Sequence, residues 1–246
     1  MKSTLLTFNL SIASTVAILG AAGAAQAFIL VPPDLNPGDQ YRLVFITDGE
    51  TNPGSTDIAD YNAFVTGDVE GSLLEMELTD AGLTTDWFAI ASTEAVDAID
   101  NTSTTGTGVP IYLITGERIA DDYLDLWDGS IQTQIDRTPS DGRPPDTTVL
   151  TGTGVNGTGG GSIGGPLGSF PFISLGLWPW DDAPLSTPDE WIDSGRTGSG
   201  SSLFAPMYAI SEVLEVSDSV STPEPISLLG FITLGGLMLG GAVRRV

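Results

Sequence analysis

The apolar run at residues 226–243 constrains the fold of this chain more than any other feature, because it has no place in a water-soluble core. It holds 18 residues without a charge. As a helix it would extend about 27 Å, close to the hydrocarbon thickness of a bilayer. Pro223 and Pro225 disfavour a helix before it, and Arg244 and Arg245 favour the cytoplasmic side. The run therefore predicts one C-terminal transmembrane helix, with the middle of the chain outside the cytoplasm.

Residues 1–27 have the pattern of a secretory signal peptide. Lys2 provides a positive start, residues 5–22 are mostly apolar, and Ala25-Gln26-Ala27 is a small-residue cleavage pattern. The alternative is a first transmembrane helix, which the interspersed Ser, Thr and Asn residues disfavour. The predicted organisation is a signal peptide (1–27), an ectodomain (28–216), a linker (217–222) and a sorting and anchor segment (223–246).

The C-terminal segment resembles the PEP-CTERM sorting signal of bacterial exported proteins. The resemblance rests on Pro223-Glu224-Pro225, the apolar run that follows, and the Arg244-Arg245 pair. It implies that signal peptidase and then a membrane exosortase process the chain during export. The product would be anchored in the membrane with its ectodomain outside, or released to the cell surface or extracellular matrix.

The composition of the middle segment excludes several kinds of partner and chemistry. Residues 28–222 hold 5 arginines, no lysine and 31 acidic residues, for a net charge of −26. Such a surface repels nucleic acid and anionic lipid headgroups, so neither is expected as a direct partner. The chain has no cysteine and no histidine, which excludes disulfides, zinc sites built on those residues, and Ser-His-Asp or Cys-His catalysis.

Hydrophobic periodicity and turn residues predict a mixed α+β ectodomain whose first and last strands pair in one sheet. The expected strands are 41–46, 87–91, 109–114, 131–135, 147–151 and 207–216. The expected helices are 58–67, 73–83, 94–100 and 121–127, the last with Leu124 and Trp127 facing inward. Residues 152–168 form a long glycine-rich loop, and Trp191 is expected to anchor the loop region in the core.

The order of short motifs after residue 87 resembles the endostatin branch of the C-type lectin-like fold. The motifs are Trp87-Phe88-Ala89, Val109-Pro110-Ile111-Tyr112-Leu113, Gly116-Glu117-Arg118-Ile119, Leu126-Trp127-Asp128-Gly129-Ser130, Thr151-Gly152-Thr153 and Tyr208-Ala209-Ile210. The resemblance implies a C-type lectin-like domain with paired terminal strands, two or three short helices and a long loop region. The ectodomain also resembles a recurring domain of sorted bacterial proteins, through Gly-Asp-Gln-Tyr-Arg-Leu at residues 38–43.

The chain departs from the lectin family at the residues that bind sugar. The family commonly has disulfides, and its calcium-dependent members carry Glu-Pro-Asn or Gln-Pro-Asp together with Trp-Asn-Asp. Trp180-Asp181-Asp182 is the nearest approach here. Exposed Trp178 and Trp180 could stack on sugar rings beside Asp181 and Asp182, whereas the alternative is that both indoles pack under the loop.

Acidic residues between 121 and 128 form the second candidate site. On a helix from residue 121 to residue 127, Asp121, Asp125 and Asp128 would share one face, and carboxylate oxygens suit calcium. The alternative is a solvated acidic surface at a helix start. No cofactor other than calcium is expected.

These features favour a non-catalytic, exported lectin-like domain that binds an exopolysaccharide or another surface protein. One alternative is a carboxylate-based hydrolase of matrix glycans, which needs two acids in one cleft. The other is a passive structural coat protein that binds no small ligand.

Overall fold

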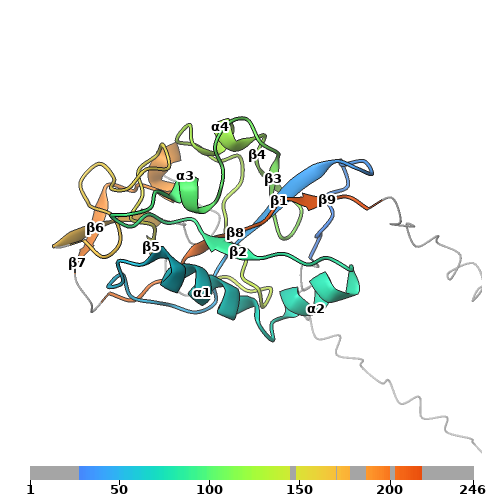
Figure 1. The fold of residues 1–246 in the computed structure, drawn as a ribbon, viewed down its shortest axis with the longest axis horizontal. Helices are drawn as coiled ribbons and strands as arrows, with labels where there is room; N and C mark the ends of the chain where they lie inside the picture. The colour runs from blue at the N-terminus through green and yellow to red at the C-terminus, as the bar shows by residue number, and fades with distance from the viewer. Residues whose placement is uncertain (1–27, 145–147, 170, 178–186, 200–202, 218–246) are drawn as a thin grey trace, which may run out of the picture.

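The structure is a computed structural model that describes residues 28–144, 148–169, 171–177, 187–199 and 203–217. It confirms a mixed α+β ectodomain built on two sheets with few helices (Figure 1). The predicted signal peptide and the predicted sorting and anchor segment lie outside the described residues. Within the described residues, no helix is long and apolar enough to cross a membrane.

The main sheet has six strands and joins the two ends of the described chain. Its order is β2-β8-β1-β3-β4, with β9 paired to β1. The strands are β1 (Gln40–Ile46), β2 (Trp87–Ala89), β3 (Ile111–Leu113), β4 (Arg118–Ala120), β8 (Tyr208–Ser211) and β9 (Leu214–Glu215). Only β1 and β3 run parallel. The predicted pairing of first and last strands is confirmed, through β8 and β9 on β1.

The last strand is interrupted, although the sequence predicts it as one run from 207 to 216. Ser211 causes the break, because its hydroxyl takes the place of a ladder partner. The Ser211 Oγ accepts a hydrogen bond from Leu43 N (2.9 Å) and donates to the carbonyl of Glu212 (2.7 Å). Glu212 and Val213 are then exposed, and the chain rejoins β1 at Leu214.

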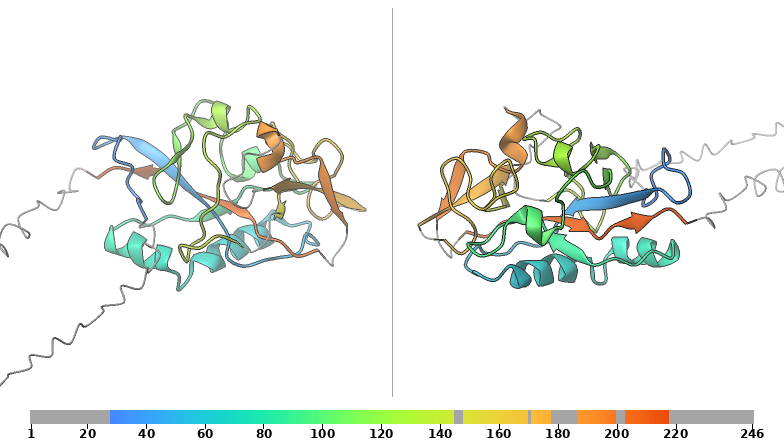
Figure 2. Two further views of the ribbon diagram at one scale, coloured as in Figure 1. Left: turned by 180° about the vertical axis from the view of Figure 1, so that it is seen from behind. Right: turned by 45° about the horizontal axis from the view of Figure 1, so that its top comes forward.

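Two helices cover one face of the main sheet, and shorter helical turns cover the other (Figures 1 and 2). The first face carries α1 (Ile58–Val69) and α2 (Leu73–Asp80). Both begin at caps typical of helix starts, since the Asp57 side chain accepts from Ala59 N and the Ser72 side chain accepts from Glu75 N. The other face carries α3 (Ala98–Asn101), α4 (Tyr123–Leu126) and the 3-10 turn η2 (Pro188–Trp191).

The sheet thus separates two apolar cores. Phe45 and Trp87 pack edge to face on the side of α1 and α2, with ring centroids 4.8 Å apart. On the other side Trp191, 1% exposed, stacks on Trp127 at 6.2 Å and lies 6.0 Å from Tyr208. The prediction that Trp191 anchors the loop region in the core is confirmed.

Several predicted element boundaries are wrong. Helix 94–100 is reduced to α3, because Ser92 Oγ accepts from Ala98 N (2.8 Å) and Thr93 N donates to the carbonyl of Val96 (2.9 Å), which keeps residues 93–96 out of the helix. Helix 121–127 is reduced to α4, where Tyr123 and Leu126 face inward and Leu124 is 62% exposed. Residues 131–135 form no strand, although Gln132 N donates to the carbonyl of Ile119 (2.9 Å).

A second sheet of three strands lies at the far end of the domain from β9 (Figure 1). It comprises β5 (Thr148–Leu150), β6 (Phe172–Leu177) and β7 (Arg196–Ser199). The sequence predicted β5 but neither β6 nor β7. The glycine-rich loop is folded against this sheet: Asp193 accepts from Ser162 N (2.6 Å), Ser174 Oγ from Gly161 N (2.7 Å), and Asp97 from Gly159 N (2.6 Å).

Candidate functional site

The acidic residues predicted to bind calcium do not share a helix face. Asp122 is the N-cap of α4, and its Oδ1 accepts from Leu124 N (2.8 Å) and Asp125 N (2.9 Å). This cap starts the helix after Asp121, and the helix ends at Leu126, before Asp128. Only Asp125 of the three predicted ligands therefore lies on the helix.

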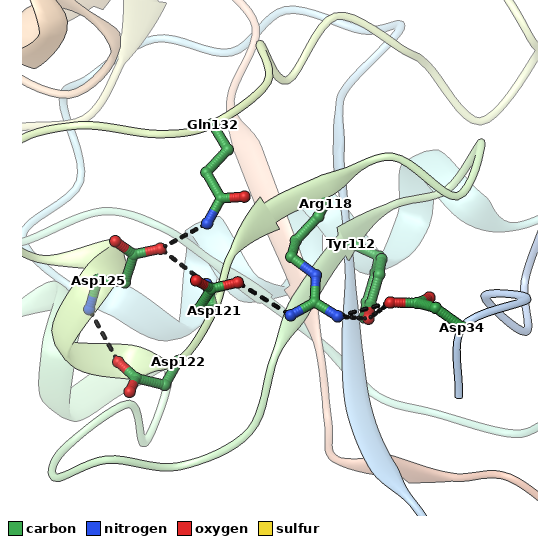
Figure 3. A network of polar contacts seen from close by, with 7 residues as sticks. All are labelled: Asp34, Tyr112, Arg118, Asp121, Asp122, Asp125 and Gln132. Atoms are coloured by element: carbon green, nitrogen blue, oxygen red, sulfur yellow. Dashed lines mark hydrogen bonds and ion pairs between the residues drawn. The ribbon is translucent and has the colours of Figure 1, made fainter. Parts of the chain in front are cut away.

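Asp121 and Asp125 instead belong to a network of polar contacts with Arg118 (Figure 3). Asp125 Oδ2 accepts from Asp121 N (2.7 Å) and from Gln132 Nε2 (3.0 Å). Arg118 donates through Nη1 to Asp121 (2.9 Å) and through Nη2 to Asp34 (2.6 Å). The Tyr112 hydroxyl also donates to Asp34 (2.9 Å), and Arg118 lies over the Tyr112 ring.

This network satisfies the carboxylates with protein donors. The hydrogen bond from Arg118 lowers the pKa of Asp121. Burial on its own raises the pKa of Asp34, but hydrogen bonds from Arg118 and Tyr112 outweigh it and lower that pKa. Asp128 lies apart and accepts from Ser130 N and Oγ, both at 2.9 Å. No group of three or more metal-ligating acids occurs among the described residues, and calcium binding here stays a prediction.

The other predicted site residues lie outside the part of the chain that the structure describes. They are Trp178, Trp180, Asp181, Asp182, Pro223, Glu224, Pro225, Arg244 and Arg245.

Sequence reasoning did not single out Arg42, a charged side chain on the central strand β1. The sequence does mark Arg42 as unusual, because it is the one charged residue of the otherwise uncharged run Tyr41–Ile46. The side chain is 2% exposed, and its guanidinium donates from Nε to the carbonyl of Ser211 and from Nη1 to that of Thr102, both at 2.6 Å. The guanidinium carbon lies 5.7 Å from the centroid of the Tyr123 ring.

The way in which α3 ends explains why the carbonyl of Thr102 needs a hydrogen bond from Arg42. Ser103 N donates to Asp100 O, and Thr104 N donates to Ile99 O (3.0 Å), which is the hydrogen-bond pattern of a Schellman helix end. Ser103 accordingly adopts the left-handed φ of 53°. The motif leaves the Thr102 carbonyl without a helical partner, and Arg42 supplies one.

The charge of Arg42 has no matching ion pair. The four ion pairs among the described residues involve Arg118, Arg137 and Arg143. Burial lowers the pKa of Arg42, while Tyr123 and Glu212 act in the opposite direction. A buried cation held only by neutral acceptors is costly, since the interior dielectric penalises charge without a counter-charge.

An open pocket of about 340 Å³ adjoins this guanidinium. It lies where α3 ends beside the break between β8 and β9. Its lining residues are Arg42, Phe88, Thr102, Ser103, Glu212 and Val213. Arg42 forms part of the lining although it is almost fully buried, and its guanidinium bonds to the carbonyl of Thr102, which also lines the pocket.

A second groove of about 290 Å³ runs between α1, α2 and β2. Its lining combines hydroxyl, carboxylate and apolar side chains: Thr66, Val69, Glu70, Glu75, Leu78, Thr79, Leu83, Thr84, Thr85 and Trp87. The two hollows meet at one contact, since Thr85 Oγ1 of the groove accepts from Glu212 N of the Arg42 pocket (2.9 Å). The groove lies on the α1–α2 side of the sheet and the Arg42 pocket on the α3 side, so the two hollows flank the edge strand β2.

Comparison with known proteins gives no further lead. No protein-family model matches the chain, and no curated protein matches its sequence.

Proposed function

We propose that this chain is an exported, exosortase-sorted bacterial protein of the envelope or extracellular matrix, whose non-catalytic lectin-like domain binds a polysaccharide. Its export and sorting to the envelope are inferred from residues 1–27 and from the C-terminal segment, which holds Pro223-Glu224-Pro225, the apolar run and Arg244-Arg245. The charge of the ectodomain, −26, supports a partner other than nucleic acid or anionic lipid.

The lectin-like assignment is supported by the arrangement of the described elements. The first and last strands pair at one end of the domain, α1 and α2 cover one face, and a long loop region builds a separate small sheet. These are the features that the resemblance implies. The assignment also explains why a glycine-rich segment of this length is folded rather than being a linker.

Polysaccharide binding rests on one observation, the two hollows that flank the edge strand β2. A polymer needs neighbouring subsites, and two hollows of about 340 and 290 Å³ lie on either side of the contact between Thr85 and Glu212. Hydroxyls of Thr79, Thr84 and Ser103 can exchange hydrogen bonds with sugar hydroxyls, while Leu83 and Phe88 offer apolar surface. The tryptophans and acids of residues 178–182 stay a second proposed contact.

A carboxylate-based hydrolase is the alternative, and the groove does contain Glu70 and Glu75. Glu75, however, is used at the start of α2, where its Oε2 accepts from Gly71 N (2.6 Å). A passive coat protein is the remaining alternative, and it would bind no glycan.

The test is retention of the purified full-length protein on exopolysaccharide from the producing cell, in calcium and again in chelator. We expect retention that Thr84→Trp, placed to fill the groove, reduces at least tenfold. The control is Thr105→Trp, an exposed threonine outside both hollows. Loss of retention in chelator would direct attention to Asp121, Asp125 and Asp181. Absence of retention in both buffers would overturn polysaccharide binding, and release of reducing ends would favour the hydrolase.

A further inference from the structure

The buried charge of Arg42 indicates which kind of sugar its pocket would accept. Its Nε and Nη1 are held by the carbonyls of Ser211 and Thr102, so both the position and the plane of the guanidinium are fixed. These two contacts use two of the five guanidinium N–H groups, and a side-chain hydrogen bond with Tyr123 involves a further one. The Tyr123 ring supports the group from one face at 5.7 Å.

A purely structural role does not require the positive charge. The two carbonyls are neutral acceptors, and a neutral amide donor could satisfy one of them without burying an ion. Among the described residues no carboxylate forms an ion pair with Arg42. This is unusual in a domain with 31 acids and 5 arginines, where a partner would be easy to supply. The nearest acid of the pocket, Glu212, is exposed at its rim.

We propose that the Arg42 pocket binds the carboxylate of an acidic sugar, such as a uronic acid residue of the polysaccharide. The ligand carboxylate would accept a charge-assisted hydrogen bond from Arg42. The Ser103 hydroxyl and the Phe88 ring would contact the sugar ring, and Thr85 lies at the β2 edge between the pocket and the groove. This inference rests on the proposed polysaccharide-binding function and narrows it to acidic polymers.

The pocket also explains how an anion could bind to so acidic a domain. Repulsion from the surface charges acts over long distances and is screened at physiological salt within about 8 Å. The contact with a buried guanidinium is screened much less. Binding of an acidic sugar is therefore expected to persist, or to strengthen, as the salt concentration rises, whereas binding to exposed arginines would weaken.

The experiment compares short oligogalacturonates with their methyl-esterified counterparts, on the full-length protein in detergent with chelator present. The two probes have the same sugar rings and differ in charge. We expect at least tenfold weaker binding of the esterified probe, which is about 1.4 kcal/mol. Equal affinity for both probes would overturn the inference and leave polysaccharide binding intact.

Three variants separate ligand binding from structural support. Arg42→Gln should abolish the preference for the free acid, but it could also loosen the contacts to Ser211 and Thr102. Val213→Trp, at a 46% exposed residue of the pocket wall, should block binding without touching those contacts. Glu212→Gln should strengthen binding of the acid severalfold, because it removes a competing negative charge; Glu215→Gln, outside the pocket, is its control and should change little. No effect of either Val213→Trp or Glu212→Gln would contradict the inference.

A second readout distinguishes this inference from the proposed function. Free galacturonate is titrated while the NMR signal of the Arg42 Nε–H is followed. A shift of that signal without any binding of the polymers would support a carboxylate pocket and overturn polysaccharide binding. No shift of the signal and no polymer binding would overturn both.

Discussion

Individual glycines in the loop region are required for space. A Cβ added at Gly176 would lie 2.2 Å from the carbonyl oxygen of Trp191, and one at Gly164 would lie 2.4 Å from Ser174 N. At Gly161 it would lie 2.5 Å from both Asp193 and Ser174. The neighbouring atoms at Gly176 and Gly164 belong to the backbone, so no side-chain rotation can move them out of contact. The abundance of glycine between residues 152 and 176 therefore reflects close packing of loops on β6.

We expect Gly176→Ala to destabilise the domain by about 1–3 kcal/mol, since the overpacked strand must shift. The matched control is Gly67→Ala on α1, where an added Cβ meets nothing within 4 Å. Alanine should stabilise that helix by about 0.5–1 kcal/mol. Urea unfolding of both variants checks the pair, and equal effects of the two substitutions would contradict this account of the loop region.

At the scale of the elements, β2 is an edge strand whose free side is capped by side chains. Asn62 of α1 accepts from Ala89 N (2.9 Å), and Asn101 of α3 donates to Ala89 O (2.8 Å). The two amides also bond to each other, at 2.8 and 2.9 Å. Edge strands invite pairing with other chains, and these asparagines occupy the groups that would pair.

Replacing Asn62 with leucine should leave the amide of Ala89 and the side chain of Asn101 without their partner. We expect a loss of about 2 kcal/mol in unfolding free energy and faster aggregation. Ala63→Leu is the control, because it adds the same apolar side chain at an exposed neighbouring position on α1. Denaturant unfolding and light scattering measure the two effects. If both variants aggregated equally, added hydrophobicity rather than the lost cap would be the cause.

The elements that the sequence predicted well are those with strong local signals. The apolar run Tyr41–Ile46 became β1, and the helices predicted from residues 58 and 73 begin at Ile58 and Leu73. Residues 131–135 failed as a strand because the Gln132 side chain bonds to Asp125 and only isolated backbone bonds form. The pocket could not be predicted, since Arg42 meets carbonyls 60 and 169 residues away in the chain.

At the scale of the whole molecule, the two cores bury all five tyrosines, four of them almost completely. Tyr41, Tyr61, Tyr112 and Tyr208 are 0 to 2% exposed. Burial raises the pKa of each of the first three to about 12, and raises that of Tyr208 further. The unfolded chain would ionise these groups near pH 10, so above that pH it binds fewer protons than the folded domain. Stability is therefore unaffected below about pH 10 and falls as the pH rises toward 12.

We expect alkaline unfolding in one steep transition between about pH 10 and 12, because up to four tyrosine protons are released together. The limiting loss of stability is about 5 kcal/mol per pH unit. Tyrosinate absorbance and far-ultraviolet circular dichroism should change at the same pH. Tyrosines that titrate near pH 10 while the circular dichroism stays native would contradict the burial of these side chains in the folded state.

The pairing of β9 with the start of β1 also determines how the domain responds to mechanical force. The chain leaves β9 beside the residue where β1 begins, and the pair runs antiparallel from Gln40 opposite Glu215. A pull on the C-terminal end would load the bonds between Val216 and residues 38 and 39 first, and then the next pair along the strand. Bonds broken one after another resist less force than bonds sheared together. A domain tethered through this end would therefore open at β9 while the strands beneath its pocket were still paired.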